Sequence, residues 1–336
     1  MKFGLAALVD VPMSAFAKRA QLVEQLGFDR LWIPDERLLR NVYVSLATAA
    51  ASTERIGIGT AVTNPYTRNP AMTAAAIATI DELSGGRAVL GLGAGGGLNH
   101  YGIERDHPAG RLADTVHIVR ALTSGGRHSY DGRYYQLVDT QLDFTPLRQV
   151  PIHIAARGPA ILELAGRVAD GVIIGGFASP PGIAWATNAV ERGLAAAGRT
   201  GADLYRTAWV FISLSDDRAA ARVAVGRMVM AAMVSSGPIL EQIGVGLPTA
   251  LRVQLDATGW AFPSESATIA ELLTDDIVDA FAVHGDPSAC VERVQAILDT
   301  GVDEIGFVIL PPEGDTVETV AVRLAESVLP MLRKDG

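Results

Sequence analysis

Two apolar runs decide the fold class: Arg55-Ile-Gly-Ile-Gly-Thr-Ala-Val-Thr-Asn64 and Arg87-Ala-Val-Leu-Gly-Leu-Gly-Ala-Gly-Gly-Gly-Leu-Asn99. Neither run alternates apolar with polar residues, and both are rich in β-branched and small residues, which is typical of strands buried on both faces of a parallel sheet. Ligands of α/β folds bind at the carboxyl ends of such strands, where a glycine lets a ligand approach the backbone closely. The sequence therefore predicts a parallel sheet with a binding site at its carboxyl edge.

Short buried segments alternate with longer segments of helical periodicity along most of the chain. The predicted strands cover residues 3–9, 30–34, 56–62, 88–94, 150–155, 171–175, 207–213 and 303–310. Eight strands separated by helices favour a closed (β/α)8 TIM barrel. The alternative is an open, doubly wound sheet of seven or eight strands.

Some helix starts carry a local signal. Asn69-Pro70 and Asp286-Pro287 each place a capping side chain before a proline, the favoured order at a helix N-terminus. Ser14 is predicted to cap the first helix. The segment 214–282 is too long for one βα unit. We expect it to be an insertion between strands seven and eight of a single domain spanning residues 1–336.

Composition excludes several kinds of partner. The net charge of −9 argues against binding to nucleic acid or to an anionic membrane. The single cysteine, Cys290, cannot form an internal disulfide, and no Cys/His spacing suits a metal site. We expect a cytoplasmic protein that binds a small-molecule substrate and no metal.

Candidate site residues stand where the predicted strands end. They are Asp35 and Glu36 after strand two, Ala61, Val62, Thr63 and Asn64 at strand three, Asn99 after strand four, Arg157 and Gly158 after strand five, and Gly175 and Gly176 after strand six. Arg157 and Gly158 can seat a phosphate with a guanidinium and free backbone N–H groups, although they can equally just begin a helix. Adjacent residues of a strand point to different sides, so Asp35 and Glu36 are not expected to act on one substrate atom. For both carboxylates, a surface or helix-start role is the alternative.

Long strings resemble a known family. Gly59-Thr-Ala-Val-Thr-Asn-Pro-Tyr-Thr-Arg-Asn-Pro70 and Ala76-Ile-Ala-Thr-Ile-Asp-Glu-Leu-Ser-Gly-Gly-Arg-Ala-Val-Leu-Gly-Leu-Gly-Ala-Gly95 resemble the luciferase-like superfamily. They look closest to its branch that uses the deazaflavin coenzyme F420, typified by methylenetetrahydromethanopterin reductase. Pro151-Ile-His-Ile-Ala-Ala-Arg-Gly-Pro159 matches the same branch. The resemblance covers mainly residues 1–180, and it implies a (β/α)8 barrel that forms a homodimer or larger assembly.

The resemblance also implies roles for individual residues. Asp35 matches an acidic residue that meets the coenzyme ring, Ala61-Val62 matches a non-prolyl cis peptide beside that ring, and Asn99 matches a polar contact to the ring or ribityl chain. Thr63 and Asn64 belong to the same expected cofactor contact. The phosphate side of the coenzyme is expected at Arg157, Gly158, Gly175 and Gly176.

Two positions depart from the family pattern. Glu36 stands where members often carry His, and we take it as the candidate catalytic residue. Gly96 stands where the related sugar-phosphate dehydrogenases carry a Glu, which disfavours dehydrogenation of a sugar alcohol because the proton lacks an acceptor. The sequence thus predicts an F420-dependent oxidoreductase that transfers hydride to or from an imine-like or activated C=C bond. The alternatives are an FMN-dependent luciferase-like monooxygenase and a cofactor-binding barrel without turnover.

Overall fold

The computed structural model describes residues 1–36, 38–260 and 273–333. Its contacts group into two compact units. One unit consists of Gly4–Ile173 and Ala189–Arg206. The other consists of Met1–Phe3, Ile174–Asn188 and Thr207–Gly336. Strand β1 and strand β8 each contribute residues to both units, and the two units are described separately below.

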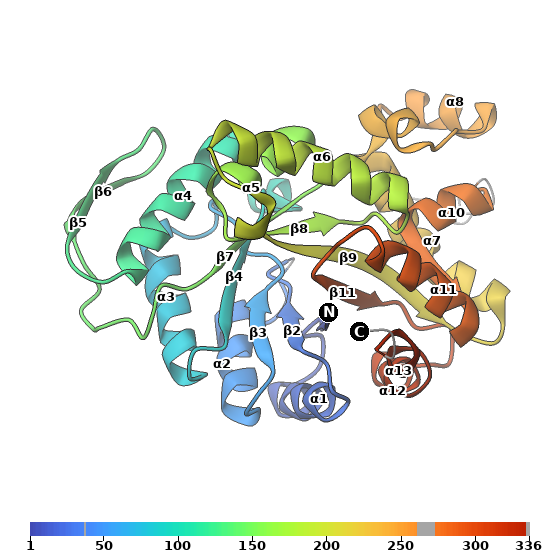
Figure 1. Ribbon diagram of the computed structural model, residues 1–336, viewed down its shortest axis with the longest axis horizontal. Helices are drawn as coiled ribbons and strands as arrows, with labels where there is room; N and C mark the ends of the chain where they lie inside the picture. The colour runs from blue at the N-terminus through green and yellow to red at the C-terminus, as the bar shows by residue number, and fades with distance from the viewer. Residues whose placement is uncertain (37, 261–272, 334–336) are drawn as a thin grey trace. The chain divides into compact units, whose positions relative to one another are not determined.

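The first unit is a run of βα repeats (Figure 1). Its parallel strands are β1 (Lys2–Ala6), β2 (Arg30–Ile33), β3 (Gly57–Thr60), β4 (Ala88–Leu92) and β7 (Ile152–Ala156), each paired with the next. The helices between and after them are α1 (Met13–Gln25), α2 (Val42–Ser52), α3 (Pro70–Leu83), α4 (Pro108–Thr123) and α5 (Pro159–Val168). Two short 3-10 turns, η1 (Leu98–Tyr101) and η2 (Gly201–Asp203), complete the unit.

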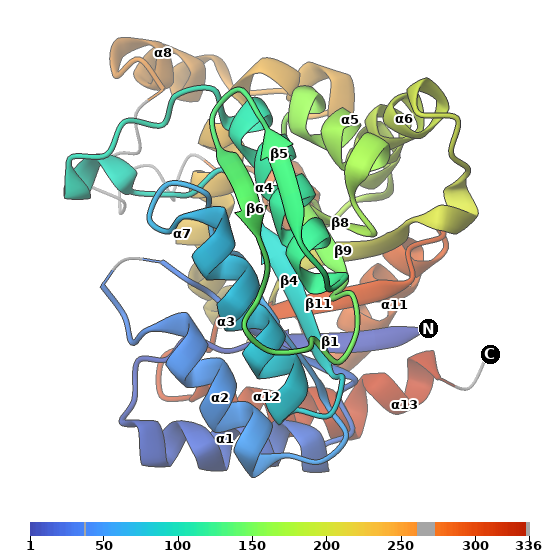
Figure 2. The same ribbon diagram turned by 90° about the vertical axis from the view of Figure 1, so that its left-hand side faces the viewer.

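An antiparallel hairpin interrupts these repeats between α4 and β7. Its strands are β5 (His128–Asp131) and β6 (Gln136–Thr140), and they form a separate two-stranded sheet. The hairpin lies alongside α4 (Figure 2). This polar stretch carries no strand signal, because one face of the ribbon is exposed and its strands therefore hold few apolar residues.

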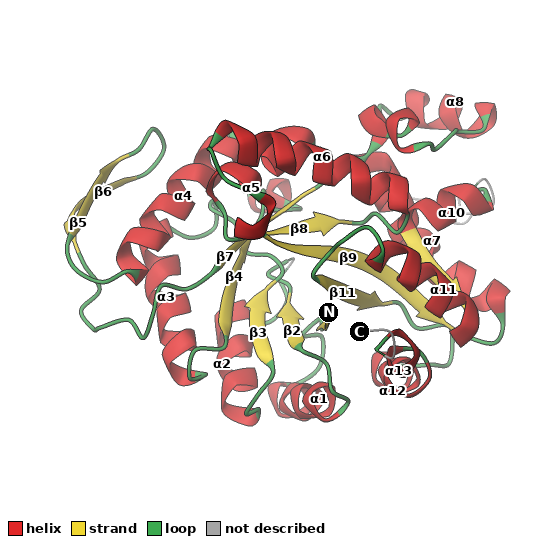
Figure 3. Ribbon diagram, viewed as in Figure 1, coloured by secondary structure: helices red, strands yellow, loops and turns green. Residues whose placement is uncertain are grey.

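The second unit holds the last strands and the insertion (Figure 3). Its strands are the end of β8 (Gly171–Gly175), most of β9 (Tyr205–Leu214), β10 (Ala282–Gly285) and β11 (Glu304–Ile309). The predicted insertion contains α7 (Arg218–Ser235), η3 (Gly237–Ile239), η4 (Glu241–Ile243), α8 (Thr249–Ala257) and α10 (Asp275–Phe281). Residues 261–272 of that insertion lie outside the described residues. The remaining helices are α11 (Pro287–Leu298), α12 (Val317–Ser327) and α13 (Leu329–Leu332). Helix α6 (Pro180–Ala196) contributes its residues up to Asn188 to this unit and the rest to the first unit.

The strand pairing defines the fold class. The order in the sheet is β10-β9-β11-β1-β2-β3-β4-β7-β8, and β8 pairs in turn with β9. The eight predicted strands therefore close into a parallel (β/α)8 TIM barrel, which confirms the predicted fold and removes the open-sheet alternative. Strand β10 is an additional parallel strand whose four residues pair with Phe211–Leu214 of β9, and it was not predicted.

Helix starts follow the sequence signals in two cases out of three. The Asn69 side chain accepts a hydrogen bond from Ala71 N, and the Asp286 side chain accepts from Ser288 N and Ala289 N, each with proline at the first helical turn. The cap predicted at Ser14 is wrong. Helix α1 begins at Met13, with Pro12 as its N-cap and no side-chain cap.

Candidate active site

A cavity of about 510 Å³ opens where β2, β3 and β4 end. It is called the strand-end cavity below, and all of its lining belongs to the first unit. It is lined by Asp35, Glu36, Leu38, Leu39, Asn41, Asn64, Tyr66, Thr67, Arg68, Gly96, Leu98, Tyr101 and Ile103. Its volume falls in the range of sites for drug-sized ligands and cofactors. The structure thus brings three predicted site residues, Asp35, Glu36 and Asn64, to one cavity.

Asp35 is held in place by two donors. Its Oδ2 atom accepts a hydrogen bond of 2.7 Å from Thr63 Oγ1 and forms an ion pair with the Arg68 guanidinium. Arg68 also donates to Thr63 Oγ1 at 3.3 Å and lies 5.2 Å from the ring centre of Tyr43. Burial raises the pKa of Tyr43 to about 12, so this phenol stays protonated beside the ion pair. Both donors engage Oδ2, which leaves Oδ1 of Asp35 for a ligand in the cavity.

The end of β3 has an unusual backbone. The peptide bond between Ala61 and Val62 is cis, as the resemblance implies. After it the chain returns to β4, because Thr63 N donates to Gly91 O at 3.0 Å and Gly93 N donates to Thr63 O at 2.9 Å. Thr63 is buried, and its hydroxyl is the one that binds Asp35.

Gly91 of β4 and Gly93, just after β4, leave room for this close approach of the chain. A Cβ atom on Gly91 would lie 2.0 Å from Thr60 O, and one on Gly93 would lie 2.5 Å from Val62 Cγ2. The expectation that these strand-end glycines leave room for a ligand is therefore wrong for Gly91 and Gly93, because Thr60 and Val62 occupy the space beside them. It fits Gly96, where an added Cβ would meet nothing within 4 Å.

Asn64 holds the turn that follows. Its side chain is 5% exposed, and its Oδ1 atom accepts hydrogen bonds of 3.0 Å from both Tyr66 N and Thr67 N. The carbonyl oxygen is thus committed to the turn. Only the Nδ2 amide of Asn64 can serve a ligand in the strand-end cavity.

The two remaining candidates near this cavity differ. Glu36 is exposed and lines the cavity. Asn99 is exposed on η1 and is not among the residues that line the cavity. The structure therefore groups Glu36 with Asp35 and Asn64, and it does not bring Asn99 into the same lining.

Arg157 and Gly158 end β7 and begin α5. Gly158 is the exposed N-cap of that ten-residue helix, and an added Cβ there would meet nothing within 4 Å. Burial lowers the pKa of Arg157 to about 10, so its guanidinium remains charged at neutral pH. A cation next to the free N–H groups of a helix N-terminus is suited to an anion.

Gly175 and Gly176 belong to the second unit, at the end of β8. Gly176 has a φ of 73°, in the left-handed region that favours glycine, and its N–H donates to Trp209 O at 3.1 Å. This N–H is therefore already used by the backbone, which leaves the carbonyl of Gly176 as the part that can meet a ligand.

Sequence reasoning found Thr63 but missed Arg68, the ion-pair partner of Asp35, and Tyr43, whose ring lies beside that guanidinium. Arg68 and Tyr43 carry no motif of their own, and Tyr66 was not singled out. For Arg68 a signal existed: it directly precedes the Asn69-Pro70 helix start, so it had to lie at the carboxyl end of β3 beside the other candidates.

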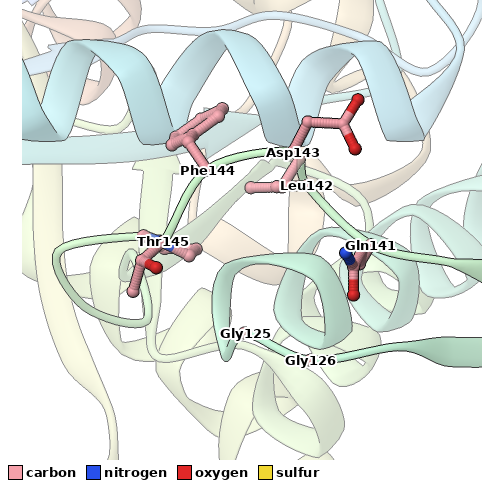
Figure 4. A pocket seen from close by; sticks show the side chains of 8 residues that line it. Gly125, Gly126, Gln141, Leu142, Asp143, Phe144 and Thr145 are labelled. Atoms are coloured by element: carbon pink, nitrogen blue, oxygen red, sulfur yellow. The ribbon is translucent and has the colours of Figure 1, made fainter.

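A second cavity, of about 250 Å³, lies at the C-terminal end of α4 (Figure 4). It is lined by Gly125, Gly126 and residues 141–146. None of the predicted site residues lines it.

No cluster of three or more His, Cys, Asp or Glu that could hold a metal ion occurs in the described part of the chain. Among the described helices, none has the length and apolar character needed to span a membrane.

The fold and the strand-end cavity define a TIM-barrel protein with a cavity at the carboxyl ends of its strands, where ligands of this fold bind. The chain belongs to the luciferase-like monooxygenase family, whose model matches residues 1–304.

Curated relatives share nearly the whole chain. The 5,10-methylenetetrahydromethanopterin reductase of Archaeoglobus fulgidus is 35% identical over 99% of this chain and 100% of its own length. An F420-dependent glucose-6-phosphate dehydrogenase of Amycolatopsis mediterranei is 30% identical over 100% of this chain and 97% of its own length. Among solved structures, the coenzyme F420-dependent tetrahydromethanopterin reductase of Methanopyrus kandleri aligns with a TM-score of 0.85 and 26% identity, covering 98% of this chain and 99% of that chain. The relatives are thus F420-dependent oxidoreductases with the same fold.

Proposed function

We propose that this protein is an F420-dependent oxidoreductase that transfers hydride between the reduced deazaflavin and an imine-like or activated C=C substrate. The observation that carries the proposal is the 35% identity over 99% of the chain with a methylenetetrahydromethanopterin reductase. An FMN-dependent monooxygenase is the alternative, supported by the family description. The F420-dependent relatives that span the chain favour the deazaflavin.

The strand-end cavity suits such a cofactor. Its volume of about 510 Å³ accommodates a flat ring system. Asp35 Oδ1 offers a fixed acceptor, because its partner oxygen is held by Thr63 and Arg68. The Nδ2 amide of Asn64 offers a donor, and the backbone of Ala61 and Val62 lies at the same strand end. When bound, reduced F420 supplies the hydride.

Glu36 is the proposed catalytic residue. It lines the cavity and is exposed, so its carboxyl group can exchange a proton with solvent and hold it beside the substrate. Reduction of a C=N or C=C bond needs only one proton besides the hydride, so a single carboxyl group is sufficient. Gly96 supplies no acid or base, which disfavours oxidation of a sugar alcohol.

The other predicted contacts remain part of the proposal. Asn99 is proposed to reach the ring or ribityl chain. Arg157 and Gly158 are proposed as phosphate contacts because a cation adjoins a helix N-terminus there. Gly175 and Gly176 are proposed as phosphate-side contacts on the strength of the family resemblance alone.

Assembly, domain organisation and location are proposed more generally. Val44 of α2 and Met72 and Leu83 of α3 are 56%, 65% and 51% exposed, and these helices pack on each other, so we propose a homodimer that covers them. Size-exclusion chromatography with light scattering tests this, because a monomeric wild-type protein would refute it.

We further propose that residues 1–336 fold as one domain. We also propose that the protein is cytoplasmic, in keeping with its single buried cysteine.

The decisive experiment is a pair of fluorescence titrations with F420 and with FMN. Micromolar affinity for F420 with little affinity for FMN supports the proposal and justifies a screen of C=N and C=C acceptors. The reverse preference, with oxygen uptake in the presence of reduced flavin, favours the monooxygenase. An Asp139→Asn variant is a suitable control, because Asp139 pairs with Arg127 at the exposed hairpin, away from the cavity lining.

A further inference from the structure

A cluster of aromatic rings surrounds Arg111 on α4. The guanidinium lies 5.4, 5.2 and 5.6 Å from the ring centres of Tyr66, Tyr134 and Tyr135. It also donates two hydrogen bonds to the Asp106 carboxylate, from Nε at 2.9 Å and from Nη2 at 2.8 Å. This pairing raises the pKa of Arg111 and lowers the pKa of Asp106, so both groups stay charged. The β5–β6 hairpin, which supplies Tyr134 and Tyr135, is thereby joined to the chain around Tyr66.

Two hydroxyl groups extend this cluster to the strand-end cavity. Tyr135 Oη donates to Pro65 O at 2.5 Å and accepts from Arg111 Nη1 at 3.2 Å. Tyr66 Oη donates to Asp106 O at 2.8 Å, and Tyr66 itself lines the cavity. Pro65 lies between Asn64 and Tyr66, so the hairpin hydrogen-bonds directly to the turn that forms part of the cavity wall.

The hairpin itself has a fixed seat on α4. The buried Asp114 carboxylate accepts from Tyr130 Oη at 2.8 Å, from Tyr134 N at 2.7 Å and from Tyr135 N at 3.1 Å. A Cβ atom on Gly110 would lie 2.3 Å from Tyr134 Cε2, so the ring rests directly on the helix backbone. These contacts fix the hairpin on α4, so the hairpin can hold the segments that it contacts in one position.

We propose that the β5–β6 hairpin is a brace for the cavity turn, residues 64–67, and that Tyr135 is its positioning residue. The turn is held from one side by Asn64 Oδ1, which accepts from Tyr66 N and Thr67 N. It is held from the other side by the Tyr135 hydroxyl through Pro65 O. The brace keeps Tyr66 and the Asn64 amide at the positions where they meet a ligand. That the ligand is F420 rests on the proposed function.

The hydroxyl of Tyr135 can be separated from the stability of the hairpin. Tyr130 and Tyr135 both belong to the hairpin segment and both donate from their hydroxyls. Tyr130 donates to Asp114 of α4 and only anchors the hairpin, whereas Tyr135 donates to the cavity turn. Tyr135→Phe and Tyr130→Phe therefore remove the same chemical group, and only the first breaks the brace.

The test compares these two variants with wild type by hydrogen–deuterium exchange at the Tyr66 and Thr67 amides and by titration with F420. We expect Tyr135→Phe to accelerate exchange at both amides about tenfold and to raise the Kd for F420 about tenfold, the scale of one lost hydrogen bond. Tyr130→Phe is expected to lower the Tm about as much as Tyr135→Phe does. It should leave the exchange rates of the Tyr66 and Thr67 amides and the Kd for F420 at their wild-type values.

Three results would overturn the brace. Wild-type exchange at Tyr66 and Thr67 in Tyr135→Phe would show that the hydroxyl does not hold the turn. Equal effects of the two variants would show that only hairpin stability matters. Faster exchange with an unchanged Kd would remove the link to binding. If wild type does not bind F420, the proposed function fails, and the exchange comparison still decides whether the hairpin positions the turn.

Discussion

Adding single methyl groups to the glycines of β4 and the loop after it tests the packing at the cavity in a graded way. A Cβ atom at residue 91 would lie 2.0 Å from Thr60 O, a backbone atom. At residue 93 it would lie 2.5 Å from Val62 Cγ2, the end of a side chain. At residue 96 it would meet nothing within 4 Å. The obstacle thus changes from backbone to side chain to open space.

The expected costs follow from what can yield. Ordinary carbon contacts lie at about 3.5–4.0 Å, so the Gly93→Ala methyl must displace Val62 by about 1 Å, an overpacking that costs about 1–3 kcal/mol. Gly91→Ala should cost more than about 3 kcal/mol, because Thr60 is fixed by hydrogen bonds between Thr60 Oγ1 and both Gly91 O, at 2.7 Å, and Gly91 N, at 2.9 Å. Gly96→Ala should change the free energy of unfolding by less than about 0.5 kcal/mol.

Urea unfolding followed by circular dichroism measures this series. We expect the loss of unfolding free energy to increase in the order Gly96→Ala, Gly93→Ala, Gly91→Ala, with similar denaturant slopes. If Gly93→Ala is as stable as Gly96→Ala, or if Gly91→Ala is the mildest change, then Gly91 and Gly93 are not needed to make room for Thr60 and Val62. The assignment of their role, as packing and not ligand access, would then be refuted.

Three further outcomes are expected. Asp35→Ala should weaken F420 binding at least about tenfold by calorimetric titration, since an ion-paired acceptor is worth about 1.4 kcal/mol or more; unchanged affinity would remove Asp35 from the site. Asn99→Ala, at an exposed position, should leave the Tm unchanged yet lower F420 affinity, and an unaltered Kd would exclude it as a contact. Glu24 accepts from Glu54 N, Arg55 N and Ile56 N; partial burial opposes ionisation, but these donors outweigh it and hold the pKa of Glu24 below its ordinary value. Its stabilisation is therefore complete above about pH 4.3 and is lost as the pH falls through the lowered pKa. Glu24→Gln should cost no more than about 1 kcal/mol at pH 7, because solvent screens this partly exposed carboxylate, and the cost should shrink as the pH falls below about 4.3. A pH-independent difference would contradict this.

The barrel was predictable because each of its eight strands is a short apolar run followed by a strong local stop or start. The cap at Asn69, in the segment between β3 and α3, shows this, since its side chain and Pro70 together specify the helix start. The misassigned cap at Ser14 shows the limit. A serine can accept a backbone hydrogen bond, but the chain enters α1 at Met13 with Pro12 before it, so Ser14 already lies within the helix.

Two strand features escaped prediction for different reasons. β10 (Ala282–Gly285) starts directly where α10 ends at Phe281, so no turn signal separates the strand from the helix, and its pairing partner is β9. The β5–β6 hairpin has exposed faces and is held by Asp114, whose three donors come from residues 130–135. The pairing of β10 depends on a strand distant in sequence, and the position of the hairpin depends on Asp114 of α4, so neither is encoded in a local pattern.

The sequence predicted the two carboxylates that line the strand-end cavity, but it did not predict the surroundings that distinguish them. Adjacent residues Asp35 and Glu36 have the same chemistry in the sequence, and the structure separates their environments. The Asp35 side chain is 17% exposed and pairs with Arg68 and Thr63, which hold its carboxylate in one position as an acceptor. Glu36 is exposed at the cavity, where a proton can be exchanged with solvent. Two neighbouring carboxylates in unlike surroundings take unlike roles, so we infer that Asp35 binds and Glu36 handles the proton. Arg68 fixes Asp35 at the cavity, because its guanidinium is paired with that carboxylate.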